Sequence, residues 1–391
     1  MIKENKIYQQ ISSSVADIED ELIIIRRAMH SNPELGREEY KTSLLIQQKL
    51  AEYGSFNFTK VGNTGFCADL ISGENKPWIA LRGDMDALPI QDQKTVSYKS
   101  QNPGVCHACG HDFHSTVVLG TAAILSKIEQ DLNYNIRFIF QHAEEPTPGG
   151  AIDFVEAGIL ENIDSIFGLH ADPMLDVEQV GILPGWISAQ SVHLKIELKG
   201  EGGHSSRPYQ SSDPIYAGIS ILNSLYAGLY RMYKPETPFV FTIGTVAGGV
   251  SYNSISDSFH AEGTLRVTDL KQRDILLDFI RKTIDEQLSR WNLTGGLDTA
   301  IGAPPVYNDI RLTKKVVDEL STVLNKDQLC EHERSMGGED FSQFLRKAPG
   351  VFMRIGVGTR QGVHTGLFDI DEQAIGFAVK VFSWLLLRIK V

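Results

Sequence analysis

The densest group of potential ligands in the chain lies at residues 105–114, which read VCHACGHDFH. Two cysteines and three histidines in ten positions offer thiolates and imidazoles, which are ligands that suit zinc-like ions. The stretch could belong to a structural zinc module, a redox dithiol, a haem-attachment site or a catalytic metal site. These four alternatives differ in what they require from the rest of the chain.

The first three alternatives leave residues unexplained. A closed zinc module usually needs a second Cys-x-x-Cys-like pair, but Cys67 and Cys330 are isolated in the sequence. A redox dithiol before a helix partly fits Cys106 and Cys109, yet it gives the neighbouring histidines no role. Haem attachment requires a histidine directly after the second cysteine, where Gly110 stands.

Polar residues at the ends of apolar runs favour the fourth alternative. Asp84 and Asp86 end PWIALRGDMD, Glu144 and Glu145 end NIRFIFQHAEE, and His170 lies at the end of DSIFGLHAD. The alternation of strand-like and helix-like segments predicts an α/β unit with a mainly parallel sheet and flanking helices. Ligands of such sheets bind beyond the carboxyl ends of the strands, so these side chains are expected to lie close together.

A binuclear metal site would use these residue types. Two divalent ions about 3.5–4 Å apart need a bridging anionic ligand and terminal imidazole or carboxylate ligands. Cys109 and His111 offer a thiolate and an imidazole two residues apart, while Glu144 and Glu145 could divide metal binding and proton transfer between them. His170 and a later histidine would complete the set. The donors suit zinc, and carboxylate with imidazole also admits manganese.

The pattern changes after GILPGWISAQ, where SVHLKIELKG alternates like a strand with one buried face. The order strand, helix, strand, strand, helix predicts an inserted α+β domain of ferredoxin-like type. We expect the catalytic domain at 1–184 and 296–391 and the inserted domain at 185–295.

The composition limits the classes of function. The chain has 391 residues and a formal net charge of −12, which argues against a nucleic-acid footprint. No apolar run approaches the roughly 20 residues that span a bilayer, so no membrane segment is expected. The start of the chain, MIKENKIYQQ, does not resemble a signal peptide. Four cysteines do not make a disulfide framework, and the chain is expected to be cytoplasmic.

The whole chain resembles the amidohydrolase branch of the aminoacylase/carboxypeptidase metallopeptidases, which includes hippurate hydrolases, N-acyl-amino-acid deacylases and auxin-conjugate hydrolases. Nine motifs in order carry the resemblance: RRAMHSNPELGREEY, LRGDMDALPI, CHACGHDFH, FQHAEE, GLHAD, KGEGGHSSRP followed by DP, GGVSYNSISDSFHAEGTLR, GGEDFSQFL and GVHTGLFDIDEQA.

The resemblance implies a set of metal ligands for two divalent ions. Cys109 corresponds to the cysteine that bridges the two ions, and His111 to a ligand in the same motif. Glu145 is the second glutamate of the AEE motif, which is a ligand in the family. His170 of GLH and the late His364 complete the implied set.

Other matched residues imply catalytic and substrate-binding roles. Glu144 corresponds to the general base, and Asp86 resembles the carboxylate that orients a ligand imidazole. In the inserted domain, His204 resembles a histidine that reaches the scissile carbonyl, often from the partner subunit. Asn253 resembles an asparagine that helps to hold the substrate.

The resemblance therefore implies a metal-dependent amidohydrolase that cleaves N-acyl amino acids to a carboxylic acid and a free amino acid. A dipeptidase or carboxypeptidase with the same site is the alternative, and the presence of Glu144 argues against a silent scaffold. The inserted domain is expected to act as a lid and to form a homodimer. Cys106 has no role in this interpretation, and the following histidines are expected to be structural or on the surface: His30, His107, His114, His142 and His332.

Overall fold

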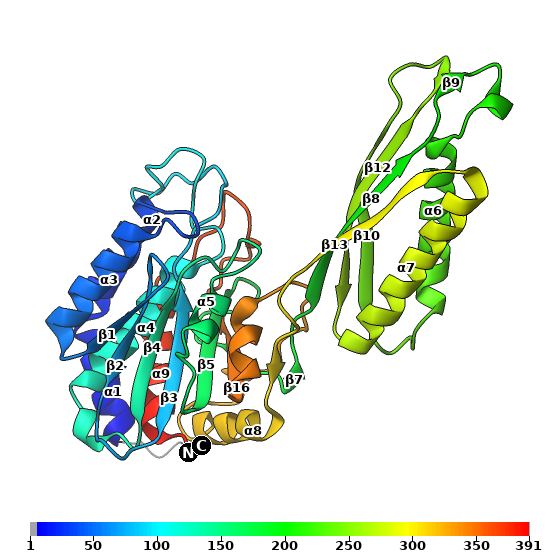
Figure 1. Cartoon of the computed structure of the whole chain (residues 1–391). Coiled ribbons are helices and arrows are strands. Elements are labelled where there is room, and N and C mark those ends of the chain that lie inside the picture. Colours follow the sequence, from blue (N-terminus) through cyan, green and yellow to red (C-terminus); the bar gives the residue numbers. More distant parts are fainter. Residues whose placement is uncertain (1–5, 391) are drawn as a thin grey trace. The chain divides into compact units, whose positions relative to one another are not determined.

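The computed structural model describes residues 6–390, which form two compact units (Figure 1). The first unit contains the described residues up to Ile187, then Val306–Glu333 and the described residues from Asp340 onward. The second unit contains Ser188–Pro305 and Arg334–Glu339. The chain leaves the first unit and returns to it, so the second unit is inserted in the first.

The first unit alternates strands with helices. In chain order its elements are α1 (Lys6–Ala16), α2 (Glu19–Ser31), α3 (Tyr40–Tyr53), β1 (Asn57–Val61), β2 (Gly65–Leu70), β3 (Trp78–Asp84), α4 (His111–Ser126), η1 (Glu129–Asp131), β4 (Asn135–Gln141), α5 (Ala151–Glu156), β5 (Ile163–Asp172), β6 (Val180–Gly181), β7 (Gly185–Trp186), β14 (Tyr307–Asn308), α8 (Ile310–Leu320), β15 (Leu329–Cys330), η4 (Asp340–Arg346), β16 (Gly350–Gly356) and α9 (Gln373–Arg388).

Eight of these strands form one sheet in the order β1-β2-β4-β3-β5-β16-β6-β15. The four central strands, β4, β3, β5 and β16, run parallel to one another. Their carboxyl ends consequently lie at one edge of the sheet, which is where the sequence places its acidic residues and histidines. The predicted α/β fold with a mainly parallel sheet is confirmed.

Helices cover both faces of this sheet, because each central strand is apolar on both sides. Alternate residues such as Leu81 and Phe167 pack into a core with α1, α2, α4 and α9. The intervening residues, such as Ala80 and Ile166, pack against α5 and η4 on the other face. Figure 1 shows α4 and α9 lying along the sheet.

Helix α4 lies unusually close to β3. A Cβ on Gly83 would stand 2.9 Å from Val118 Cγ2 and 3.0 Å from the carbonyl oxygen of His114, so only glycine permits this approach. Gly110 precedes α4 with φ 87°, a left-handed conformation that glycine adopts without strain. The two glycines bring the first turn of α4 against the end of β3.

The second unit is a four-stranded antiparallel sheet in the order β10-β12-β8-β13. Its elements are β8 (Gln190–Lys199), β9 (Gly203–His204), η2 (Pro208–Gln210), α6 (Pro214–Gly228), η3 (Leu229–Arg231), β10 (Phe239–Gly248), β11 (Ser254–Ile255), β12 (Ser258–Val267), α7 (Leu270–Trp291) and β13 (Thr294–Ile301). Alternate residues of β8 and β12 pack against α6 and α7 in a separate core. The expected α+β architecture is thus present.

The fourth strand of this sheet, β13, extends past residue 295, where we expected the inserted domain to end. It belongs to the small sheet because Thr294 to Ile301 pair with β8. Among the described residues, the helices are all too short or too polar to cross a bilayer.

Candidate binuclear metal centre

Four segments bring candidate ligands to the carboxyl edge of the large sheet. Asp84 ends β3, and Glu144 and Glu145 follow β4. His170 lies near the end of β5, and Cys109 stands just before α4. All these segments belong to the first unit. The structure therefore assembles residues that are far apart in the sequence: Asp84 and His170 are separated by 86 positions.

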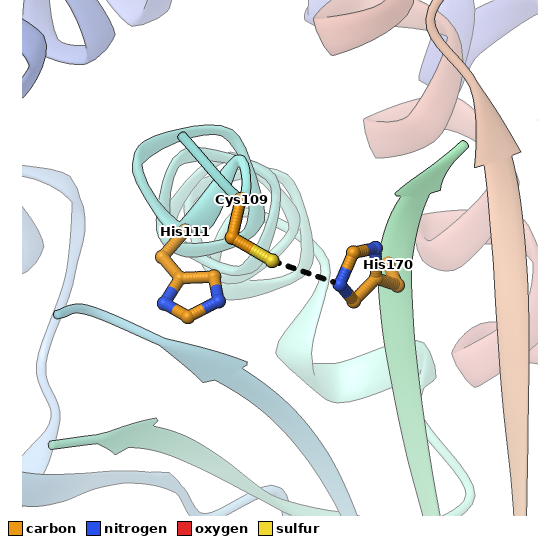
Figure 2. A group of neighbouring side chains, drawn as sticks. All are labelled: Cys109, His111 and His170. Atoms are coloured by element: carbon orange, nitrogen blue, oxygen red, sulfur yellow. Dashed lines mark hydrogen bonds between the residues drawn. The ribbon is translucent and has the colours of Figure 1, made fainter. Parts of the chain in front are cut away.

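Cys109, His111 and His170 form one group of ligand atoms, all within 4.8 Å of one another (Figure 2). Cys109 Sγ lies 3.3 Å from His170 Nε2. His170 Nδ1 is 2.7 Å from the carbonyl oxygen of Ala171, which can only accept. Nδ1 consequently carries the proton, and Nε2 presents its lone pair toward the sulfur.

A second group contains Cys109, Glu145 and His364. His364 Nε2 lies 3.1 Å from Glu145 Oε1. His364 has φ 62°, an uncommon conformation for a residue with a side chain, and its backbone N–H donates to Ala108 at 2.6 Å. Cys109 belongs to both groups, which is the arrangement expected of a ligand between two ions.

Asp86 joins the two sides of the site. Its Oδ1 lies 3.1 Å from His111 Nδ1 and accepts the backbone N–H of Glu144 at 3.0 Å. Its Oδ2 accepts the backbone N–H of Glu145 at 3.1 Å. This carboxylate thus orients an imidazole and fixes the position of both glutamates, as expected for a residue behind a metal ligand.

Glu144 stands at the same place as the candidate ligands without being a member of the two cysteine groups. It forms a third group with His111 and Glu145. Its Oε1 lies 3.4 Å from the backbone nitrogen of Asp340, and the side chain is half-buried. A carboxylate here can reach a water molecule held at the centre, which a general base requires.

The charges of these groups suit divalent cations. Burial raises the pKa of the Cys109 thiol, so the sulfur keeps its proton until a cation replaces it. Burial, followed by the charge of Arg354, lowers the pKa of His170 well below its usual range, so this imidazole is neutral. Burial alone would lower the pKa of His111, but the charge of Asp84 and the hydrogen bond with Asp86 help to raise it well above the usual value.

Two buried atoms in the site make no hydrogen bond of good geometry. His111 Nε2 and Glu145 Oε1 are shielded from solvent, and the close contact of His364 Nε2 with Glu145 Oε1, at 3.1 Å, does not have hydrogen-bond geometry. Orphaned polar atoms of this kind are rare in proteins because each one costs free energy. His111 Nε2 lies 3.9 Å from Glu145 Oε1, a distance that leaves room for an ion between them. The residues present therefore fit a metal centre.

The two remaining predicted residues, His204 and Asn253, lie in the second unit. His204 is in β9, which pairs with β11 directly after Asn253, and the N–H of Ser205 donates to the Asn253 carbonyl at 3.2 Å. The N–H of Ser206 donates to His204 Nδ1 at 3.1 Å, and the Ser206 hydroxyl lies 2.8 Å from the same atom. His204 therefore carries its proton on Nε2, which is free to donate.

The sequence did not identify His114 as part of this site. Its Nδ1 lies 2.6 Å from Asp84 Oδ1, and its Nε2 accepts the backbone N–H of Ala171, the neighbour of His170, at 2.8 Å. Asp84 is held in turn by Arg82 at 2.7 Å. Asp84 with His114 is thus a second carboxylate–imidazole pair beside the pair of Asp86 with His111.

The spacing His-x-x-His was the available signal for His114, since residues i and i+3 share a face of a helix. Five histidines were expected to be structural or on the surface, and all five are buried, which agrees with the structural alternative: His30, His107, His114, His142 and His332. Cys106 is also buried, with no ligand group among the described residues.

Comparisons with known proteins agree with this geometry. Residues 80–388 match the family model described as peptidase family M20/M25/M40. Thermostable carboxypeptidase 2 of Saccharolobus solfataricus is 34% identical, over 98% of this chain and 98% of that protein. N-acetyl-L-cysteine deacetylase of Bacillus subtilis is 34% identical, over 93% of this chain and 86% of that protein.

A solved structure, the Bacillus subtilis YXEP protein described as a dinuclear metal binding peptidase of family M20, is 32% identical. It superposes with a TM-score of 0.83, covering 95% of this chain and 98% of that one. One longer relative from Rhodococcus jostii is 36% identical, and the chain spans about half of its length (46%). The chain belongs to peptidase family M20/M25/M40 and is a metal-binding hydrolase that acts on amide bonds.

Proposed function

We propose that the protein hydrolyses N-acyl amino acids to a carboxylic acid and a free amino acid. The observation that carries the proposal is the sharing of Cys109 between two ligand groups, with Glu144 beside them. The deacetylase of Bacillus subtilis, a relative over 93% of this chain, supports an acyl group on the substrate nitrogen.

We assign two divalent ions, zinc or manganese, to five ligands. Cys109, which belongs to two ligand groups, would be shared by the ions, and His111, Glu145, His170 and His364 would be the remaining ligands. When bound, the ions would supply Lewis acidity and make a water molecule between them more acidic. The dinuclear description of the related YXEP protein supports this number of ions.

The residues of the chain then carry the proton transfers. Glu144 accepts the proton of the attacking water and later delivers it to the leaving amine nitrogen, so that the base is regenerated. Asp86 keeps the His111 imidazole and the two glutamates in place through its three contacts. His204, whose Nε2 carries a proton, is the proposed donor to the oxygen on which negative charge develops. Asn253 is the proposed second substrate contact in the same unit.

The alternative is a carboxypeptidase or dipeptidase, which the carboxypeptidase of Saccharolobus solfataricus favours. A panel of N-acetyl, N-benzoyl and N-indoleacetyl amino acids should be assayed beside dipeptides, with zinc and with manganese. The proposal expects kcat/KM for at least one N-acyl amino acid to exceed that for every dipeptide. Preference for dipeptides would favour the alternative.

Glu144→Gln, assayed on the same panel of substrates, tests whether Glu144 is the general base. The variant should keep its metal content and lose about 10²–10⁴-fold or more in kcat, since the amide cannot accept a proton. Near-normal turnover would contradict the assignment of Glu144.

We also propose a homodimer formed through the inserted unit. β10 lies at an edge of the small sheet, with its outer side unpaired among the described strands. Val246 is 56% exposed, and Val250 and Tyr252, just beyond β10, are 100% and 99% exposed. An exposed apolar edge of this kind is usually covered. Light scattering should give twice the chain mass; a fully active monomer would contradict the proposal.

The cytoplasmic location stays a prediction.

A further inference from the structure

Arg354 lies beside the metal centre and has no assigned role. It belongs to β16, which pairs in parallel with β5, and its partner in the register is His170. On its other side it pairs with Gly181 of β6. Adjacent strands are about 4.8 Å apart, so Arg354 and a proposed metal ligand are immediate neighbours across the sheet.

The side chains of Arg354 and His170 project from the same face of the sheet. Met353 and Ile355, on either side of Arg354, pack into the core with α4 and α9. Leu169 and Ala171, on either side of His170, pack into the same core. Because side chains alternate along a strand, Arg354 and His170 must both lie on the opposite face.

Phe352 fixes where the guanidinium lies on that face. Arg354 Cζ is 5.8 Å from the centroid of the Phe352 ring, and the His170 ring centroid is 6.4 Å from the same ring. The guanidinium and the His170 imidazole therefore lie near the same ring, on the same face of the sheet.

Arg354 has no anionic partner within residues 6–390, although it is half-buried. The buried arginines of the same unit are all paired: Arg26 with Asp112 and Asp369, and Arg82 with Asp84 and Asp340. A partly desolvated cation without a counterion is unfavourable, and bound divalent cations nearby would add repulsion. An anionic ligand would relieve both effects.

We propose that Arg354 binds a carboxylate of the substrate and so makes this site selective for amides that carry a free carboxylate. A guanidinium matches a carboxylate in shape, because two parallel N–H groups can reach both oxygens. The inference rests on the proposed function, since it names the substrate group that the site selects. The carboxylate could belong to the amino-acid part or to the acyl part of the substrate, and the experiment separates the two.

A purely structural role for Arg354 makes a different prediction. Arginine stems often cover apolar side chains while the charged end stays in water, and Arg354 could cover Phe352 in that way. Methionine would keep most of that packing and remove only the charge. Arg354→Met therefore tests recognition, and Arg354→Lys tests whether the charge alone restores it.

The two variants and the unmodified protein are compared on three substrates. N-acetylleucine carries its carboxylate on the amino acid, N-succinylleucinamide carries it on the acyl group, and N-acetylleucinamide has none. Arg354→Met should raise KM about 10- to 100-fold for one carboxylate substrate, with kcat little changed. The KM for N-acetylleucinamide should stay the same, and Arg354→Lys should restore part of the lost binding.

Two further measurements keep this inference separate from the proposed function. Metal content should be unchanged in Arg354→Met, and loss of metal would overturn the inference by showing a structural effect. The three compounds are also titrated by calorimetry into metal-loaded Glu144→Gln protein with and without Arg354→Met. If no substrate is hydrolysed, the proposed function fails, and calorimetry still tests carboxylate binding. Equal losses for all three compounds, or no loss for any, would overturn the role of Arg354.

Discussion

Two substitutions of His114 separate its two hydrogen bonds. The side-chain amide of asparagine lies near the position of Nδ1, so His114→Asn can keep the contact with Asp84, at 2.6 Å in the native protein. The asparagine cannot reach the backbone N–H of Ala171, which in the native protein donates to His114 Nε2 at 2.8 Å. Glutamine is longer, so His114→Gln can accept that N–H in place of Nε2 while it loses the contact with Asp84.

Both variants should be less stable than the native protein. A buried N–H left without an acceptor costs about 1–3 kcal/mol, and a hydrogen bond to a charged group contributes about 1.5–3 kcal/mol. Asp84 keeps its ion pair with Arg82 at 2.7 Å in either case, so no buried charge is left alone. We expect each variant to lose about 2–3 kcal/mol in the free energy of unfolding, measured in urea on the metal-free protein.

Metal affinity should distinguish the variants. Ala171 follows His170, so His114→Asn releases the strand end that carries a proposed metal ligand. Residues behind metal ligands typically contribute about 10- to 100-fold to metal affinity, and we expect a loss of that size, measured by competition with a chelator. His114→Gln should keep near-native affinity. His142→Asn is the control, because this buried histidine bonds to Asp153 at 2.8 Å and should affect stability alone. Equal metal affinity in both His114 variants would refute the positioning role.

Three further predictions concern neighbouring residues. Cys109→Ala should lose bound metal by elemental analysis and Cys106→Ala should not; equal loss in both would revive a dithiol site. Ser206→Ala should lower kcat by roughly 2- to 10-fold with metal content unchanged, because one of two contacts to His204 Nδ1 is lost. Unaltered kcat would remove the hydroxyl from the mechanism. Burial lowers the pKa of His107 to about 4, from 6.5. Between these two pH values, His107 therefore binds a proton in the unfolded chain but not in the folded one. The metal-free protein should therefore lose about 2 kcal/mol as the pH falls from about 6.5 to 5, and His107→Gln should lose less in urea titrations.

Much of the site could be predicted because its residues stand at strand ends. Glu144, Glu145 and His170 each end an apolar run, and the parallel order of β3, β4 and β5 brings such ends together. That inference needs only the number and direction of strands. It does not need the geometry of any loop, so it can be made before the fold is known.

Arg354 shows what such reasoning could not reach. In the sequence it interrupts an apolar strand, GVFMRIGVG, and a single charge there gives no indication of its neighbours. The role that we propose for Arg354 depends on its register with His170 and on the lack of a carboxylate within reach. Both are properties of the folded chain. Local pattern predicts where a strand lies, whereas register is set by packing along the whole sheet.

The two carboxylate–imidazole pairs show how much a pair of short motifs can specify together. Asp84 and Asp86 are two residues apart at the end of β3, while His111 and His114 are three residues apart in the first turn of α4. The contacts run in opposite order, Asp84 with His114 and Asp86 with His111, so the strand and the helix must pass antiparallel. Two strand residues cover about 6.7 Å and three helical residues about 4.5 Å, which is close enough for both pairs to form. The combination of Asp-x-Asp and His-x-x-His thus encodes a strand packed against a helix, and Gly83 permits the close approach.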